Sequence, residues 1–252
     1  MARCRGESTE LQPLILMPLA FWMISMEGEM KMSNRIAVIG ESGSGKTTAM
    51  RTLDPATTFY IDVDGKGLSW KGWKNQYHGA LGKDQPMPNY FKTRDIQMIR
   101  ACVEKVATDP KYKNVRTIVI DTLNTAMVDK EVKGMREKGY DKWIDLASYV
   151  WDLIEAAGNL RDDLTIIFTF HSETVRDDLG YSFTHIKTNG RKLEKLVLES
   201  LFTTVLLARM NDAGENVLVS KAQNATCKAP MGALPDEMPN DMQAVLDALK
   251  DY

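Results

Sequence analysis

The chain has 252 residues, 44% hydrophobic and 26% charged, which suits one ordinary globular domain and leaves little room for a second large one. The formal net charge of −2 argues against a globally basic nucleic-acid binder, so any contact with a polyanion must come from local patches. Three cysteines lie far apart, with no C-x-x-C pair and no histidine at metal-ligand spacing. This pattern predicts a reduced, cytoplasmic protein without structural zinc.

The first 32 residues differ from the rest of the chain. Their apolar run "LILMPLAFWMI", at 14–24, is too short to span a bilayer and contains Pro18, and no A-x-A signal cleavage site follows. We therefore expect no membrane contact. Residues 1–32 are interpreted as a leader that is either disordered or the product of a mis-assigned start, with translation beginning at Met26, Met30 or Met32; residues 33–252 are the predicted domain.

The stretch "RIAVIGESGSGKTTAM", at 35–50, predicts a strand, a loop and a helix. Its "GESGSGKT" fits G-x-x-x-x-G-K-[ST], in which glycines let backbone N–H groups approach phosphates and the following helix presents its positive end. Lys46 is predicted to reach the β and γ phosphates, and the Thr47 hydroxyl to bind Mg²⁺. The alternative is an ordinary Gly/Ser-rich turn. The predicted nucleotide-binding residues are Gly40, Glu41, Ser42, Gly43, Ser44, Gly45, Lys46, Thr47 and Thr48.

The remaining elements alternate between strand-like and helical patterns. Strands are predicted at 57–65, 115–122, 164–171, 201–209 and 216–220, and helices at 95–109, 143–160 and from Asn240 or Asp241 onward. Such alternation predicts an α/β fold, a doubly wound and mainly parallel sheet that binds ligands at the carboxyl ends of its strands.

Asp121 ends the apolar strand "TIVID", where a carboxylate can hold a Mg²⁺-bound water opposite Thr47, as in a Walker B motif. The plainer reading is an aspartate that simply ends a strand. Thr122 follows it, whereas many ATPases place a catalytic glutamate there. A base that activates water must therefore come from elsewhere or be missing.

Asp62 and Asp64, at the end of the second predicted strand, are the candidate bases, and Asp64 is preferred. The alternative is that Asp64 and Gly65 only form a turn. His171 ends "TIIFTFH" and is predicted to donate a hydrogen bond to the γ-phosphate or to the attacking water, so that it senses hydrolysis. The alternative is a strand-end histidine bonded to a loop carbonyl.

Four motifs in order, "GESGSGKT", "FYIDVDG", "TIVIDT" and "TIIFTFHSE", resemble the RecA-like ATPase core. More closely, "GYDKWIDLASYVWDLI", "FHSET" and "TCKAPMGALPDEMPNDMQAVLDAL" resemble phage-encoded AAA/RecA-like nucleotide-binding proteins, some of which are single-strand annealing or recombination ATPases. The resemblance covers about residues 34–251. It implies the strand order 5-1-4-3-2, with the His171 strand between the phosphate-loop strand and the Asp121 strand. Aspartate at 64, where RecA has glutamate, departs from the pattern.

Two segments are candidate nucleic-acid contacts. Basic and aromatic residues alternate after Gly65, as stacking rings and phosphate-binding lysines would in a single-stranded DNA site; they are Lys66, Trp70, Lys71, Trp73 and Lys74. The alternative is that the tryptophans pin this loop to the core. The second segment carries Lys187, Arg191 and Lys192 and corresponds in order to the DNA-binding loop of RecA-like recombinases; the alternative is a solvated charged face.

The resemblance also implies a homo-oligomer in which a basic residue, Lys221 or Lys228, completes a neighbouring site. The function predicted is a Mg²⁺-dependent ATP hydrolase acting on single-stranded DNA in phage recombination, annealing or replication, with a single-strand-binding protein as a further partner. A nucleotide-gated binding protein that does not hydrolyse ATP is one alternative. The other is a small-molecule phosphotransferase, for which the sequence offers no Arg-rich lid.

Overall fold

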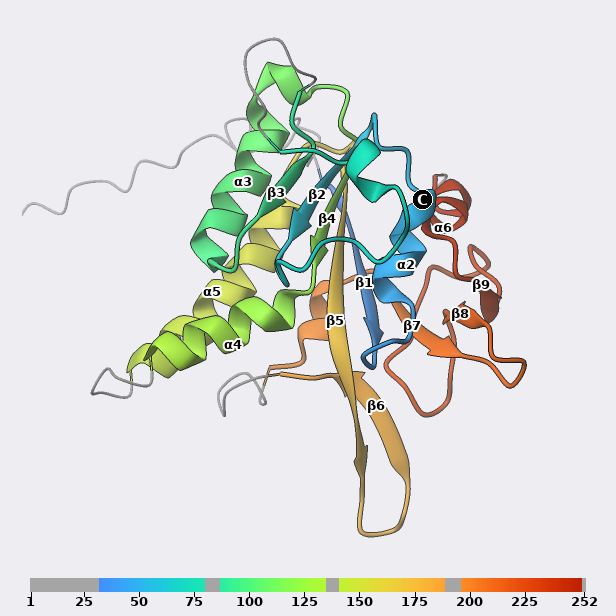
Figure 1. Ribbon diagram of the computed structural model, residues 1–252. Helices are drawn as coiled ribbons and strands as arrows, with labels where there is room; N and C mark the ends of the chain where they lie inside the picture. Colours follow the sequence, from blue (N-terminus) through green and yellow to red (C-terminus); the bar gives the residue numbers. More distant parts are fainter. Residues whose placement is uncertain (1–31, 80–86, 135–140, 189–195, 251–252) are drawn as a thin grey trace, which may run out of the picture. The chain divides into compact units, whose positions relative to one another are not determined.

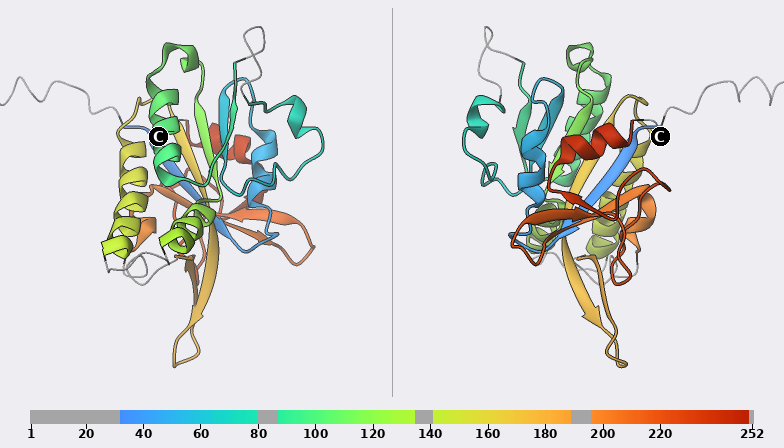
Figure 2. Two further views of the ribbon diagram at one scale, coloured as in Figure 1. Left: turned by 60° about the vertical axis from the view of Figure 1, so that its left-hand side comes forward. Right: turned by 90° about the vertical axis from the view of Figure 1, so that its right-hand side faces the viewer.

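The computed structural model describes residues 32–79, 87–134, 141–188 and 196–250. Within them a nine-stranded sheet lies between two layers of helices (Figures 1 and 2). Its strands are β1 (Asn34–Gly40), β2 (Thr58–Asp62), β3 (Tyr90–Lys92), β4 (Thr117–Asp121), β5 (Thr165–Arg176), β6 (Ser182–Ile186), β7 (Thr204–Met210), β8 (Asn216–Val219) and β9 (Glu237–Pro239). The helices are α2 (Lys46–Ala49), α3 (Ile96–Thr108), α4 (Leu123–Gly134), α5 (Asp141–Gly158) and α6 (Met242–Ala248).

The sheet order is β3-β2-β4-β5-β1-β7-β8-β9, with β6 paired to β5 outside this path. The first six strands of this path pair in parallel, whereas β6, β8 and β9 pair antiparallel to their neighbours. Counting β1, β2, β4, β5 and β7 as strands 1 to 5, the order reads 5-1-4-3-2. The predicted order is therefore confirmed, and β5 lies between β1 and β4.

In the central strands, successive side chains point to opposite faces of the sheet. Both faces are buried, as a parallel sheet with helices on each side requires. In β1, Ala37 and Ile39 pack in the cluster that α3, α4 and α5 cover, whereas Ile36 and Val38 pack with α2 and α6. The helices are placed by their own sequences: α3 buries Ile96, Ile99, Val103 and Val106 on one face. Asp95 caps its start, because its carboxylate accepts the N–H groups of Gln97 and Met98. In the same way, Asp241 caps α6.

Several elements differ from the sequence expectation. β5 does not end at His171 but continues to Arg176 and forms with β6 a hairpin that projects from the sheet (Figure 1). The predicted strand at 201–209 begins at Thr204, after a 3-10 turn. Helix α4, which the sequence analysis missed, starts two residues after Asp121. Among the described helices, none is both long and apolar enough to cross a membrane.

Candidate functional site

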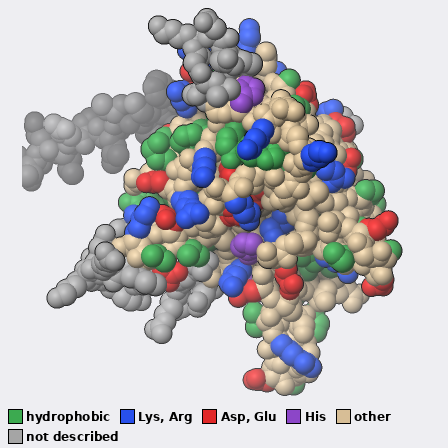
Figure 3. All heavy atoms as spheres, viewed as in Figure 1, with side chains coloured by type: hydrophobic (Ala, Val, Ile, Leu, Met, Phe, Trp, Pro, Cys, Tyr) green, Lys and Arg blue, Asp and Glu red, His purple; other side chains and the backbone are tan. Residues whose placement is uncertain are grey.

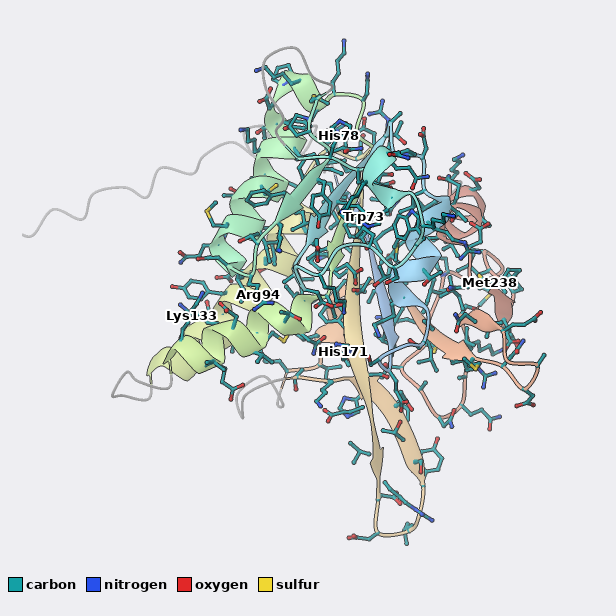
Figure 4. All side chains as sticks on the ribbon, in the orientation of Figure 1. Trp73, His78, Arg94, Lys133, His171 and Met238 are labelled. Carbon is teal, nitrogen blue, oxygen red and sulfur yellow. The ribbon has the colours of Figure 1, made fainter. Side chains whose placement is uncertain are left out.

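Four parallel strands bring the predicted site residues to one edge of the sheet. Gly40, at the end of β1, pairs with His171 in β5, and Asp62, at the end of β2, pairs with Asp121 in β4. The loop after β1 therefore lies beside His171, and Asp121 lies one strand further. Figure 4 shows His171 on this edge, where β5 leaves the body of the sheet.

The loop from Gly40 to Gly45 depends on close packing that only glycine permits. Gly45 has φ +93°, and a Cβ there would come within 2.8 Å of the Asn240 amide nitrogen and 2.9 Å of the Asn216 amide carbon. A Cβ at Gly40 would lie 2.5 Å from the Ala208 carbonyl oxygen. Asn240 also donates its side-chain N–H to the Gly45 carbonyl at 3.1 Å, which ties the loop to the segment before α6.

Lys46 is buried within this loop. Its ammonium donates to the carbonyl oxygens of Gly40 at 2.7 Å and Glu41 at 2.6 Å. Burial lowers the pKa of Lys46 from 10.5 to about 8, although the nearby carboxylates of Asp121 and Asp64 oppose the shift. A phosphate would replace the carbonyl partners with a full negative charge, which favours the charged lysine.

The helix after the loop is shorter than expected. α2 spans four residues and passes directly into a 3-10 turn over Met50–Thr52. A helix this short has a small macrodipole, so the positive potential at the loop comes mainly from Lys46 and from the loop's own N–H groups.

The Asp121 carboxylate accepts hydrogen bonds from four hydroxyl groups. Thr47 at 2.7 Å and Tyr60 at 2.5 Å donate to Oδ2, while Thr122 at 2.9 Å and Thr169 donate to Oδ1. Burial, followed by the neighbouring Asp121 charge, raises the pKa of Tyr60 well above its usual value, so the phenol remains a donor. The Asp121–Thr122 peptide bond is cis.

The predicted magnesium residues are thus in direct contact, and their chemistry fits the ion. Mg²⁺ prefers hydroxyl, carboxylate and phosphate oxygens. In the described part of the chain, no cluster of three or more His, Cys, Asp or Glu side chains could hold a metal alone. Thr47 and Asp121 would therefore hold Mg²⁺ together with the oxygens of a bound nucleotide, where the ion would neutralise phosphate charge.

The two candidate bases have different environments. The Asp62 carboxylate accepts the N–H groups of Gly65 at 2.7 Å and Gly67 at 2.9 Å, and the Tyr90 hydroxyl at 2.5 Å. These donors occupy both of its oxygens and its side chain is buried, so Asp62 closes the turn after β2 in this structure. Asp64 stays the preferred candidate base.

Asp64 lies past the end of β2, with its side chain 12% exposed. Its carboxylate forms an ion pair with Lys66 and accepts the Thr125 hydroxyl. Burial alone would raise the pKa of Asp64, but the bonds from Lys66 and Thr125 outweigh burial and lower it. Asp64 is therefore ionised, and two donors hold it.

His171 lies inside β5 rather than at its end. Its backbone N–H donates to the Asn124 side chain at 2.7 Å, and its carbonyl accepts the Lys187 N–H at 2.8 Å. Burial, and then the charge of Lys46, lowers the pKa of His171, so the imidazole is neutral near pH 7 and can both donate and accept a hydrogen bond.

The loop after Asp64 points its rings inward and its lysines outward. Trp70 packs edge-on against Tyr60 and Tyr77, and Trp73 lies against Tyr90 with ring centroids 5.3 Å apart. These contacts support the alternative interpretation, in which the tryptophans hold the loop against the core. Lys66, Lys71 and Lys74 are exposed, and Figure 3 shows basic side chains spread over the face above β5. Binding of DNA by this surface stays a prediction.

The other predicted contacts are only partly described. Lys187 is exposed and directly follows β6, at the base of the β5–β6 hairpin. Arg191 and Lys192 lie outside the described residues. Lys221 is exposed, and the backbone of Lys228 pairs with Val205 in β7. Whether either lysine completes the site of a neighbouring subunit stays a prediction.

Sequence reasoning missed Tyr60, Thr125 and Thr169, the hydroxyl groups that hold Asp121 and Asp64. Tyr60 and Thr169 lie within apolar strands, where such residues are usually interpreted as core. The available signal was their position: each lies two residues before a predicted polar site residue, Asp62 or His171, and so faces the same side of its strand.

A parallel sheet with this strand order, a glycine-rich loop after β1, and Lys46, Thr47 and Asp121 at one edge together define a P-loop NTPase. Residues 32–228 match the family described as AAA domain, and because the match covers most of the chain, the protein belongs to that family. The flagellar accessory protein FlaH from Methanocaldococcus jannaschii has a similar structure, at 12% identity and a TM-score of 0.42, covering 84% of this chain and 86% of that one. Among curated proteins, none matches the chain.

Proposed function

We propose that this protein binds ATP with Mg²⁺ and hydrolyses it, and that single-stranded DNA stimulates turnover. The contact between Thr47 and Asp121 carries the proposal, because the hydroxyl of a phosphate loop and a strand-end carboxylate, 2.7 Å apart, form a Mg²⁺–nucleotide site when phosphate is present. Lys46 binds the phosphates. Asp64 is the candidate base, and His171, which lies beside the end of β1, is the candidate contact to the γ-phosphate or the attacking water.

The Lys66–Asp64 ion pair supports a link to a polyanion. Lys66 is 67% exposed on the loop after Asp64, whereas its partner Asp64 is 12% exposed and lies near Lys46 and His171. A phosphate backbone that binds the loop competes for Lys66 and leaves Asp64 free to accept a proton from water. We propose accordingly that the protein acts on DNA in recombination, annealing or replication, in a phage or its host, and that it assembles as a homo-oligomer.

One observation favours a second candidate function. Thr122 follows Asp121, where a glutamate could have activated water, and Asp64 is already held by Lys66 and Thr125. With no partner to release Asp64, the protein would bind ATP and hydrolyse it slowly. It would then be a nucleotide-gated binding protein.

The test is ATP hydrolysis by the full chain, with and without single-stranded DNA, beside Lys46→Ala and Asp64→Ala. We expect DNA to raise turnover, Lys46→Ala to weaken nucleotide binding strongly, and Asp64→Ala to lower kcat about 100-fold or more with nucleotide affinity retained. Nucleotide binding without turnover, whether or not DNA is present, would reject the hydrolase in favour of the gated binding protein.

A further inference from the structure

The carboxylate of Asp121 is held by strands on both sides of β4. Tyr60 on β2 donates to Oδ2, and Thr169 on β5 donates to Oδ1. Both donors are fully buried, and Asp121 itself is 5% exposed. Since a carboxylate offers about four acceptor positions, the four hydroxyls around Asp121 leave little of it unsatisfied.

The Tyr60 contact has a counterpart one strand further along the sheet. Tyr90 on β3 donates to Asp62 on β2 at 2.5 Å, just as Tyr60 on β2 donates to Asp121 on β4. Each phenol reaches the aspartate that ends the neighbouring strand. The Tyr60 ring is itself fixed between Trp70 and Tyr77, with centroids 6.4 and 5.5 Å away, so its hydroxyl has little freedom to move.

Thr47 donates to the same oxygen of Asp121 as Tyr60 does, at 2.7 Å. Its hydroxyl oxygen keeps lone pairs for a cation while its proton stays directed at Oδ2. Because Asp121 is buried, loss of a donor would leave part of its carboxylate unsatisfied, which is costly. Tyr60 therefore holds Oδ2 beside the hydroxyl that would bind Mg²⁺.

We propose that Tyr60 and Thr169 are positioning residues for the Mg²⁺ site: they hold the buried Asp121 carboxylate in one orientation, with Oδ2 beside the Thr47 hydroxyl. Neither residue touches substrate. Groups that orient a metal-binding residue in this way typically change metal affinity by about 10- to 100-fold when they are removed. The inference rests on the proposed nucleotide site and assigns two further residues to it.

The test is binding of a fluorescent ADP analogue to the full chain over a range of Mg²⁺ concentrations and in EDTA. For Tyr60→Phe, we expect the Mg²⁺ concentration at half-maximal tightening to rise about 10-fold, with affinity in EDTA unchanged. A merely structural role would lower affinity equally with and without Mg²⁺. Either that equal loss or an unchanged Mg²⁺ requirement would overturn the inference.

Tyr77→Phe is the matched control. Tyr77 is buried beside Tyr60, and in the described part of the chain its hydroxyl bonds no carboxylate, so the Mg²⁺ requirement should equal that of the wild type. If Tyr60→Phe does not fold, Thr169→Val tests the other oxygen by the same criteria. A wild-type protein that binds no nucleotide with Mg²⁺ would instead reject the proposed function itself, so the two failures are distinguishable.

Discussion

Lys46 gives the nucleotide site a dependence on pH. Its pKa is lowered to about 8 by burial, whereas a bound phosphate favours the charged form and raises the pKa again. Below pH 8 the lysine is charged in both states, and affinity does not depend on its titration. Above pH 8 the free protein has lost the proton and must take one up on binding, so affinity falls by up to about tenfold per pH unit.

This pH prediction is checked by calorimetry of a non-hydrolysed ATP analogue at pH 7 and pH 9, in buffers with different ionisation enthalpies. We expect uptake of close to one proton at pH 9 and little at pH 7. Lys46→Met, measured at whatever analogue concentration its weaker binding requires, should lose the uptake. Equal affinities at the two pH values in the wild type would contradict the assignment.

At the same scale, the sequence predicted the chemistry of single positions well where a motif fixed the geometry. Lys46, Thr47 and Asp121 could be placed because the loop spacing and the end of an apolar strand determine where such side chains lie. The partners of Asp64 could not, because Thr125 comes from a helix the sequence did not reveal and Lys66 resembles any exposed lysine.

At the scale of elements, the loop from Asp64 to Tyr77 connects the site to the surface. Its rings pack on β2 and β3, and its lysines face solvent. Lys66→Met removes the ion pair to Asp64 while leaving the rings in place. We expect ATP turnover without DNA to rise by up to about fivefold, because an exposed ion pair contributes up to about 1 kcal/mol. We also expect DNA to stimulate turnover less than in the wild type.

Lys71→Met is the control for this loop, because Lys71 is an exposed lysine of the same segment. It should lower DNA affinity to a similar extent without raising basal turnover. The measurement is steady-state ATP hydrolysis across a DNA titration. Basal turnover that is equal in Lys66→Met and the wild type would show that the ion pair does not restrain Asp64.

Element order followed from the sequence, but element ends did not. The alternation of strand and helix patterns predicted a mainly parallel α/β sheet, and the resemblance to the RecA-like core implied the order 5-1-4-3-2, which the structure has. The continuation of β5 past His171 was not expected, because "SETVR" is mostly polar, its last three residues are exposed, and it pairs only with β6, so no hydrophobic pattern marks it as a strand. The three-residue strands β3 and β9 are too short for any periodicity to reveal.

At the scale of the whole molecule, the candidate site and the helix layer formed by α3, α4 and α5 belong to one folded body over Met32–Tyr252. Ile154 on α5 is fully buried in the hydrophobic cluster between this helix layer and the sheet. Its backbone carbonyl accepts a hydrogen bond from the Arg35 guanidinium at 3.2 Å. Arg35 lies at the opposite end of β1 from Gly40, so Ile154 is more than about 10 Å from the phosphate loop, given a rise of about 3.3 Å per strand residue.

Ile154→Ala should therefore act on stability alone. The cavity it leaves costs about 2–5 kcal/mol of unfolding free energy, measured by denaturant titration. An ATP analogue with Mg²⁺ at about 100 times its Kd stabilises the folded state by about 2.7 kcal/mol, and because distant effects add, this increment should be the same in Ile154→Ala and the wild type. Lys46→Ala should lose the increment while keeping the fold. A smaller stabilisation by the ATP analogue in Ile154→Ala than in the wild type would mean that the layer of α3, α4 and α5 shifts when nucleotide binds. The phosphate loop would then not be energetically independent of that layer.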